Sequence, residues 1–161
     1  IMATTTATIS LNSSDILSQA ISLSSTMTLY KGDTTATGLE QMNYHRVIVP
    51  IDDYGGSTAT QFDLIPESDA LKDNSNYLYI VNKNTDVTHY VTISIGAEVI
   101  GSLYAGDWMF IPWSNDVSDT HAATDPSGND TSIEVQAFVA SATLEYALFH
   151  VGETLLTAGD S

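Results

Sequence analysis

Apolar and polar residues alternate in short runs along much of the chain, most clearly between residues 77 and 113. Within residues 88–95, the side chains at alternate positions fall on one face of the predicted strand: His89, Val91, Ile93 and Ile95. Such alternation is typical of a half-buried antiparallel strand. Three further runs, 77–84, 98–104 and 107–113, are separated by only a few turn residues. Because a crossover helix does not fit into these gaps, we expect antiparallel pairing throughout.

Similar runs flank this central stretch. Residues 44–51 alternate, and Pro50 predicts that this strand ends there or lies at a sheet edge. Residues 133–139 and 144–149 predict a second hairpin that closes the chain. Residues 12–29 fit a short helix or a strand, but their serine and threonine content favours extended structure with at most one helical turn.

A count of about eight to ten short strands predicts an all-β fold, an antiparallel two-sheet β-sandwich that is jelly-roll-like. With 161 residues, the chain has the size of one domain. We expect an extended N-terminal arm over residues 1–12, a single β-sandwich over 13–151 and a frayed C-terminal tail over 152–161. The Thr/Ala-rich arm is expected to be disordered or to become ordered by docking on a neighbour. Because Ile1 precedes Met2, either Met2 is the natural start or the chain is processed.

Charge and composition exclude several kinds of partner. The chain has 20 acidic and 4 basic residues, for a formal net charge of -16. The basic residues are scattered and form no patch for phosphates, so we expect no direct contact with nucleic acid. They are Lys31, Arg46, Lys72 and Lys83. The absence of cysteine excludes disulfides and thiolate metal sites. No apolar run approaches the ~18 residues that a membrane span needs, and no secretory signal is visible, so we expect no membrane partner.

Candidate catalytic and metal-binding residues are few. The four histidines form no closely spaced pair that could begin a metal site: His45, His89, His121 and His150. His45 and His89 lie on the apolar faces of their strands, which predicts hydrogen-bonded sheet histidines. No nucleophile elbow, phosphate loop or dinucleotide fingerprint is present. We therefore expect no enzymatic activity, no cofactor, and no catalytic, cofactor-binding or metal-binding residues.

Two loops and two aromatic residues leave alternatives open. In the acidic loop 114–130, Asp125, Asn129 and Asp130 are either turn residues or the ligands of a weak cation site, which would lack the terminal glutamate of an EF-hand. The loop 52–60 carries an aspartate pair and a glycine pair. Tyr90 and Phe138 fall on the otherwise polar faces of their strands, where they serve either an interface or a partly exposed sheet surface.

Three segments carry a resemblance to a known class of proteins. They are Tyr-Leu-Tyr-Ile-Val-Asn-Lys-Asn at 77–84, Leu-Tyr-Ala-Gly-Asp-Trp-Met-Phe-Ile-Pro-Trp at 103–113 and Leu-Glu-Tyr-Ala-Leu-Phe at 144–149. In these segments the chain resembles small virion structural proteins of tailed bacteriophages, particularly marine phages and those of cyanobacteria. The likeness covers roughly residues 77–151.

The resemblance implies a capsid decoration (cement) protein, or another head or tail component, that carries no catalytic residues. It implies binding to the lattice of the major capsid protein on the virion surface, assembly in the host cytoplasm and a homo-oligomeric state such as a trimer. A receptor- or carbohydrate-binding module of a fibre or tail, acting through the loops 52–60 or 114–130, is the alternative.

Overall fold

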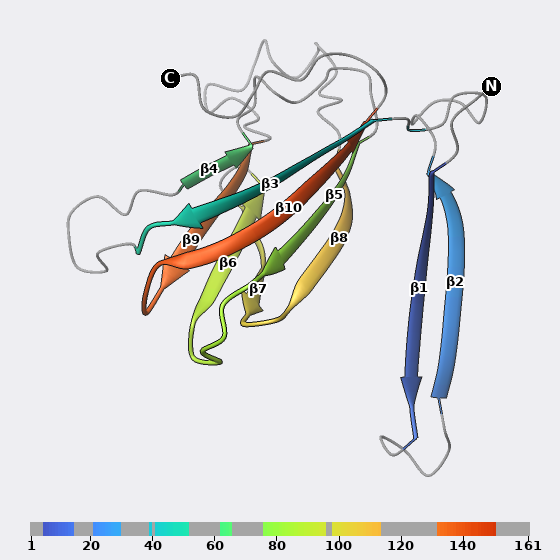
Figure 1. Ribbon diagram of the computed structural model, residues 1–161, viewed down its shortest axis with the longest axis horizontal. Coiled ribbons are helices and arrows are strands. Elements are labelled where there is room, and N and C mark those ends of the chain that lie inside the picture. The colour runs from blue at the N-terminus through green and yellow to red at the C-terminus, as the bar shows by residue number, and fades with distance from the viewer. Residues whose placement is uncertain are drawn as a thin grey trace.

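The computed structural model describes residues 5–14, 21–29, 39, 41–51, 62–65, 76–95, 98–113 and 132–150. These residues form ten strands and no helix (Figure 1). The strands are β1 Thr5–Ser13, β2 Ile21–Leu29, β3 Gln41–Val49, β4 Phe62–Ile65, β5 Asn76–Asn82, β6 Tyr90–Ile95, β7 Glu98–Tyr104, β8 Trp108–Trp113, β9 Ile133–Phe138 and β10 Ala142–His150. Across these ranges, no helix could cross a membrane.

Eight of the strands form two four-stranded sheets, with orders β3-β10-β5-β8 and β4-β9-β6-β7. Four pairs of strands are antiparallel: β6–β7, β5–β8, β4–β9 and β3–β10. In chain order, each pair encloses the previous one, so the pairs are nested around the β6–β7 connection. Residues from the inner faces of both sheets form one hydrophobic core. The prediction of an all-β, antiparallel two-sheet sandwich is confirmed. Only β6 and β7 are both consecutive in the chain and paired within this sandwich.

The core follows from the alternation of each strand. In β6, Val91 and Ile93 are fully buried, as their shared face predicts. They pack in one cluster with side chains of the opposite sheet. The buried cluster contains Val49, Leu64, Ile65, Leu78, Ile80, Val91, Ile93, Leu103, Trp113, Ile133, Val135, Ala137, Ala142, Leu144, Tyr146 and Leu148. Because both sheets contribute side chains to this cluster, the apolar face of each strand points toward the opposite sheet.

The predicted second hairpin over residues 133–149 is wrong. Strand β9 pairs with β4 and β6, whereas β10 pairs with β3 and β5, so the two strands lie in different sheets. The chain turns this corner at Val139, whose φ of 76° lies in the left-handed region that is strained for a β-branched residue. Both strands have a strongly apolar face, and placing one in each sheet lets both faces enter the core.

The two predicted sheet histidines have different outcomes. His45 lies in β3, where its ring stacks on Tyr146 at a centroid distance of 5.2 Å. His89 precedes β6, which begins at Tyr90, so its placement in a strand is wrong. It belongs to a turn in which its amide donates to the Asp86 carbonyl at 3.1 Å. The Thr88 amide and hydroxyl donate to the Asp86 carboxylate, and these hydrogen bonds lower the pKa of Asp86.

Strand β3 occupies one edge of its sheet and ends at Val49, directly before Pro50. This agrees with the expected effect of a proline, which cannot donate a ladder hydrogen bond.

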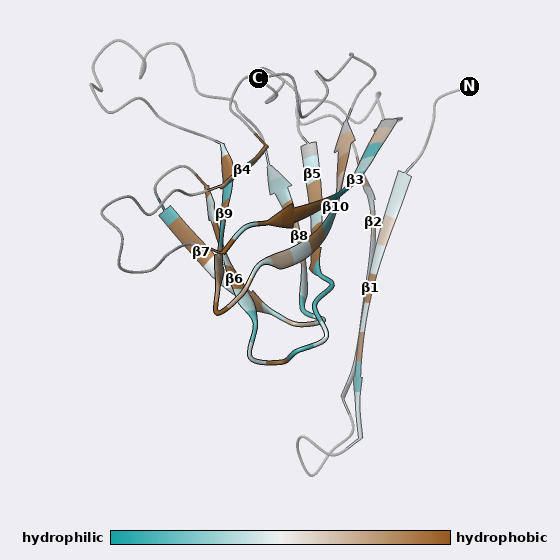
Figure 2. Ribbon diagram, turned by 60° about the vertical axis from the view of Figure 1, so that its left-hand side comes forward, coloured by the Kyte–Doolittle hydropathy of each residue, from teal (hydrophilic) through white to brown (hydrophobic). Residues whose placement is uncertain are grey.

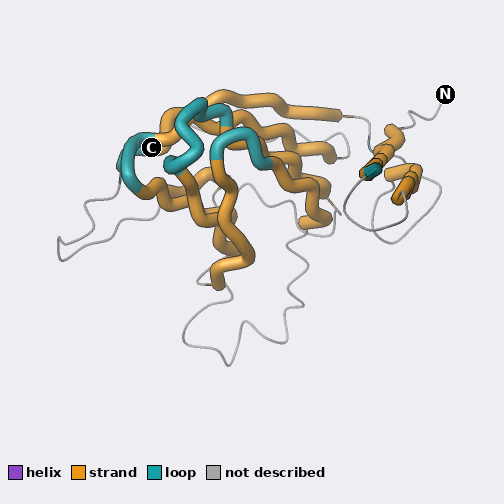
Figure 3. The backbone as a smooth tube through the Cα atoms, turned by 90° about the horizontal axis from the view of Figure 1, so that it is seen from below, coloured by secondary structure: helices purple, strands orange, loops and turns teal. Residues whose placement is uncertain are grey.

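Strands β1 and β2 form a separate antiparallel hairpin beside the sandwich (Figures 1 and 3). Part of the segment expected as an arm, residues 5–12, is therefore in a strand paired within the same chain. Residues 21–29, expected to be extended, form its partner. The hairpin is anchored at its base, where the Thr5 hydroxyl donates to the Leu39 carbonyl at 2.6 Å and the Leu39 amide donates to the Leu29 carbonyl at 3.2 Å. Leu29 and Leu39 are both buried.

Buried Asn82 joins three turns at one end of the sandwich. Its amide nitrogen Nδ2 donates to the Leu103 carbonyl at 3.0 Å, and its Oδ1 accepts from the Asn84 amide at 3.0 Å. The Gly106 amide donates to the Asn82 carbonyl at 2.8 Å, at a φ of 86° that favours glycine. The Asn84 side chain in turn accepts from the Thr143 amide at 3.1 Å. Residues 82–84 and 103–106 thus tie the two sheets together.

We predict that Asn82→Ala lowers the free energy of unfolding by about 2–4 kcal/mol, because it leaves the Leu103 carbonyl and the Asn84 amide without their partner. Urea unfolding followed by fluorescence measures this loss. The control, Thr85→Ala, changes an exposed residue of the adjacent turn and is expected to be near neutral. Equal stability of the two variants would contradict a structural role for Asn82.

Candidate interaction surface

The outer face of the β3-β10-β5-β8 sheet is apolar at most positions. Because the inner face of the same sheet forms the core, this sheet carries apolar side chains on both sides. Three rows cross its four strands in register. The first row is Met42, Phe149, Tyr77 and Pro112, the second is Tyr44, Ala147, Tyr79 and Phe110, and the third is Arg46, Glu145, Val81 and Trp108. We call these twelve residues the aromatic face.

The rings of this face contact one another across neighbouring strands. Tyr77 stacks on Phe110 at a centroid distance of 5.5 Å, and Phe110 meets Phe149 edge-on at 6.2 Å. Tyr79 and Trp108 lie 6.2 Å apart in a tilted arrangement. Such pairs hold the rings in fixed orientations. Among the large hydrophobic side chains of the face, three stay largely exposed in a single copy: Met42 at 56%, Tyr44 at 54% and Trp108 at 51%.

The few charges on the aromatic face neutralise one another. Glu145 lies 3.7 Å from both Arg46 and Lys83, measured between the charged atoms. The hydroxyl of Tyr44 donates a hydrogen bond to the same carboxylate, and this bond raises the pKa of Tyr44. Two of the chain's four basic residues are therefore placed beside one carboxylate, in a protein with a net charge of -16. The aromatic face carries no excess of negative charge.

The opposite face of the sandwich differs in charge. The strands β4, β6, β7 and β9 contain three carboxylates and no lysine or arginine: Asp63, Glu98 and Glu134. Asp63 and Glu134 are direct cross-strand partners. Like charges in this arrangement repel each other. The two sheets therefore differ in charge: the aromatic face is close to neutral, and the strands of the second sheet carry only carboxylates among their charged residues.

Tyr90 and Phe138 form a smaller cluster on this second sheet. Their rings stack at a centroid distance of 4.9 Å, and Tyr104 lies 5.2 Å from Tyr90. The placement of Tyr90 and Phe138 away from the core face agrees with the sequence analysis. Both rings are half-buried where they stack on each other.

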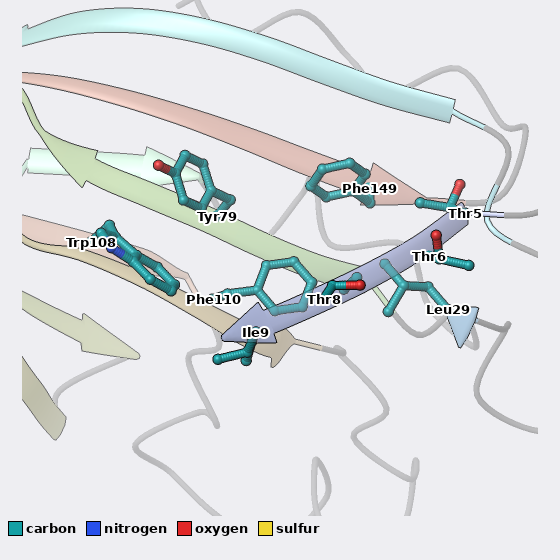
Figure 4. A pocket seen from close by; sticks show the side chains of 10 residues that line it. Thr5, Thr6, Thr8, Ile9, Leu29, Tyr79, Trp108, Phe110 and Phe149 are labelled. Atoms are coloured by element: carbon teal, nitrogen blue, oxygen red, sulfur yellow. The ribbon is translucent and has the colours of Figure 1, made fainter. Parts of the chain in front are cut away.

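The base of the β1–β2 hairpin lies over one part of the aromatic face. A groove of about 360 Å³ separates them. Residues 5–9 of β1 and Leu29 line one side, and Tyr79, Trp108, Phe110 and Phe149 line the other (Figure 4). The hairpin therefore covers the aromatic face only in part.

The two faces of the hairpin have opposite character. On one face, threonine, serine and asparagine pair across the strands, with the Thr8 and Thr26 hydroxyls 2.9 Å apart and the Ser22 hydroxyl donating to Asn12 at 2.7 Å. On the other face, Thr5 and Ala7 are half-buried against the sandwich. This face continues toward the free end of the hairpin as an exposed apolar strip that contains Ile9, Leu11, Leu23 and Met27.

The free end of the hairpin extends past the strands of the sandwich (Figures 1 and 2). Neither Thr5–Ser13 nor Ile21–Leu29 contains a charged residue. Natural sheet edges are usually protected from other chains by charges, prolines or bulges. An isolated two-stranded hairpin is also only marginally stable in water. The two hairpin strands therefore lack the charges, prolines and bulges that usually protect a sheet edge.

Most residues proposed from the sequence for chemistry lie outside the described part of the chain. This holds for Asp125, Asn129 and Asp130, for His121 and for the loop 52–60. Among the described residues, no three histidine, aspartate or glutamate side chains are grouped so that they could hold a metal ion.

Sequence reasoning missed the aromatic face because it assigned most aromatic residues to the core. A usable signal was present. Residues 77–81 and 108–113 are almost continuously apolar and do not alternate. A continuous apolar run indicates a strand covered on both sides.

In comparisons with known proteins, no family model matches the chain, and no curated protein matches its sequence at a significant level.

We predict that Glu145→Gln lowers the pKa of Tyr44 toward its ordinary value near 10, because the raised value comes first from the hydrogen bond to Glu145. That bond favours the protonated phenol, so its contribution to stability is present below the ordinary pKa. It is lost as the pH rises through the raised value. NMR titration of labelled tyrosine rings measures the shift. Glu134→Gln, on the other sheet, is the control, and an equal effect of both variants would contradict the hydrogen bond.

Proposed function

We propose that this chain is a non-enzymatic structural protein of a bacteriophage virion, specifically a capsid decoration (cement) protein. It binds the lattice of the major capsid protein on the outside of the head and stabilises it as a homo-oligomer, with a trimer as the proposed state. Assembly takes place in the host cytoplasm. The proposal extends the sequence resemblance over residues 77–151.

The observation that carries this proposal is the pair of uncovered surfaces, the aromatic face and the apolar strip of the hairpin. A surface with exposed rings on its edge strands and little net charge resembles a protein–protein interface in composition. Exposed apolar patches of this kind mark sites of association in soluble proteins. A decoration protein must present such surfaces, because it acts by contacting neighbouring subunits.

The strand order also supports the proposal. Nested pairing around β6–β7, with the strands distributed over two sheets, is the arrangement expected of a jelly roll. Jelly rolls occur in viral capsid proteins, and also in lectins and cupins. A fold shared by such different proteins does not decide function by itself. Here the fold supports the proposal because it agrees with the exposed surfaces and with the sequence resemblance.

A receptor- or carbohydrate-binding module of a fibre or tail is the second candidate. One observation favours it: Tyr44 and Trp108 hold exposed rings on the outer face of one sheet. Sugar rings stack on aromatic side chains in such places, and lectins share the jelly-roll architecture. The two candidates differ in copy number, because a lattice is covered by many subunits and a fibre carries few.

Quantitative mass spectrometry of purified virions tests the proposal. We expect a copy number comparable to that of the major capsid protein, as full coverage of a lattice requires. A few copies per particle would favour the fibre or tail module. Absence from the particle would contradict both candidates. The major tail-tube protein and a known fibre protein in the same sample serve as internal standards for high and low copy number.

A further inference from the structure

We propose that the β1–β2 hairpin of one copy docks, through its apolar strip, on the aromatic face of a second copy of this chain. The proposal rests on the function above and deepens it, because it names the contact that would hold the homo-oligomer together. The donor strip contains Ile9, Leu11, Leu23 and Met27, and the acceptor contains Met42, Tyr44 and Trp108.

The contact between hairpin and aromatic face already exists in part within one copy. Thr5 and Ala7 at the hairpin base are half-buried, and β1 lines a groove against Phe110 and Phe149 (Figure 4). Beyond this base, Leu11 is 56% exposed and Leu23 is 59% exposed on the same face of the hairpin. A single copy therefore uses the beginning of the strip and leaves the remainder uncovered. A second copy extends a contact whose chemistry the chain already uses.

Charge favours a second copy over other partners. Two chains with a net charge of -16 repel each other wherever their acidic surfaces meet. The hairpin strands carry no charge, and the aromatic face carries one carboxylate placed between Arg46 and Lys83. These are the surfaces through which two such chains can approach with least repulsion. A basic partner would be drawn instead to the acidic sheet that carries Asp63 and Glu134.

The sizes of the two surfaces agree. Along its strand, the apolar strip spans residues 23–27 of β2, and the aromatic face spans residues 145–149 of β10. At about 3.3 Å per residue, both surfaces extend for about 15 Å. The hairpin strip and the aromatic face are also different surfaces of the chain. Two copies can therefore exchange hairpins reciprocally in a two-fold dimer, or each copy can dock on the next, which closes a ring where the rotation between copies closes.

The absence of cysteine allows a direct test with single-cysteine variants of the full chain. Leu11→Cys places a thiol on the apolar strip, and Tyr44→Cys places one on the aromatic face. The two variants, one with an added mass tag, are mixed and treated with a short bis-maleimide cross-linker. We expect a mixed dimer of Leu11→Cys with Tyr44→Cys. Ser10→Cys, on the opposite face of the same strand, is the matched control and is expected to give several-fold less of it.

Sedimentation velocity of the unmodified chain, across a range of concentrations and sodium chloride levels, provides an independent readout. We expect one discrete oligomer whose association strengthens with salt, because screening reduces repulsion between acidic copies and hardly weakens an apolar contact. Leu11→Thr combined with Leu23→Thr is expected to shift the chain toward monomer. These exposed positions tolerate threonine in a strand, so the variant keeps its fold, which circular dichroism verifies.

Three results would overturn the inference. One is equal cross-linking of Leu11→Cys and Ser10→Cys to Tyr44→Cys, and another is a monomer at every concentration and salt level. The third is association that weakens with salt, which would assign the contact to ion pairs. Because no phage head is present in these experiments, their failure leaves the copy-number test of the proposed function untouched. A monomer that still coats heads would assign the aromatic face to the capsid lattice instead.

Discussion

The structure depends on one constraint: the β3-β10-β5-β8 sheet must remove apolar side chains from water on both of its faces. Its inner face meets the second sheet, and together they form the core around Leu78, Ile80 and Leu144. On its outer face, the part of the chain that the structure describes places the base of the β1–β2 hairpin, and Trp108 and Tyr44 stay exposed. One apolar face of this sheet is fully covered and the other is covered in part. The apolar area that stays exposed does not contribute the free energy that burial would give. The interface that we propose follows from this imbalance.

The distribution of charge determines which surface of the sandwich is best suited to contact with another acidic chain. An acidic chain stays soluble through repulsion between copies, and this repulsion opposes any contact that brings acidic surfaces together. The aromatic face avoids the problem because Arg46 and Lys83 both lie beside Glu145. The strands of the other sheet contain only carboxylates among their charged residues. The contact that we propose therefore uses the side of the sandwich that carries the aromatic face.

The sequence predicts which side chains point inward better than it predicts which strands pair. The alternation in residues 90–95 and the proline after Val49 correctly indicated a half-buried strand and an edge strand, because both effects act within one segment. Alternation says which side chains point inward, but not which sheet holds the strand. The connection at Val139 was therefore misread as a hairpin, although it crosses between sheets. The aromatic face was missed for a related reason: whether an aromatic ring is buried depends on what covers the sheet, and that cover comes from residues far away in the chain.

Hydroxyl-radical footprinting of the chain tests most directly the claim that the aromatic face is covered by protein in the assembled state. Methionine, tyrosine and tryptophan side chains report on it, with Met42 and Trp108 on the aromatic face and Tyr104, 50% exposed, on the opposite sheet as the internal reference. Our account predicts that oxidation of Met42 and Trp108 falls as the protein concentration rises, while that of Tyr104 stays constant. Unchanged oxidation of Met42 and Trp108 at concentrations where the chain is oligomeric would contradict it.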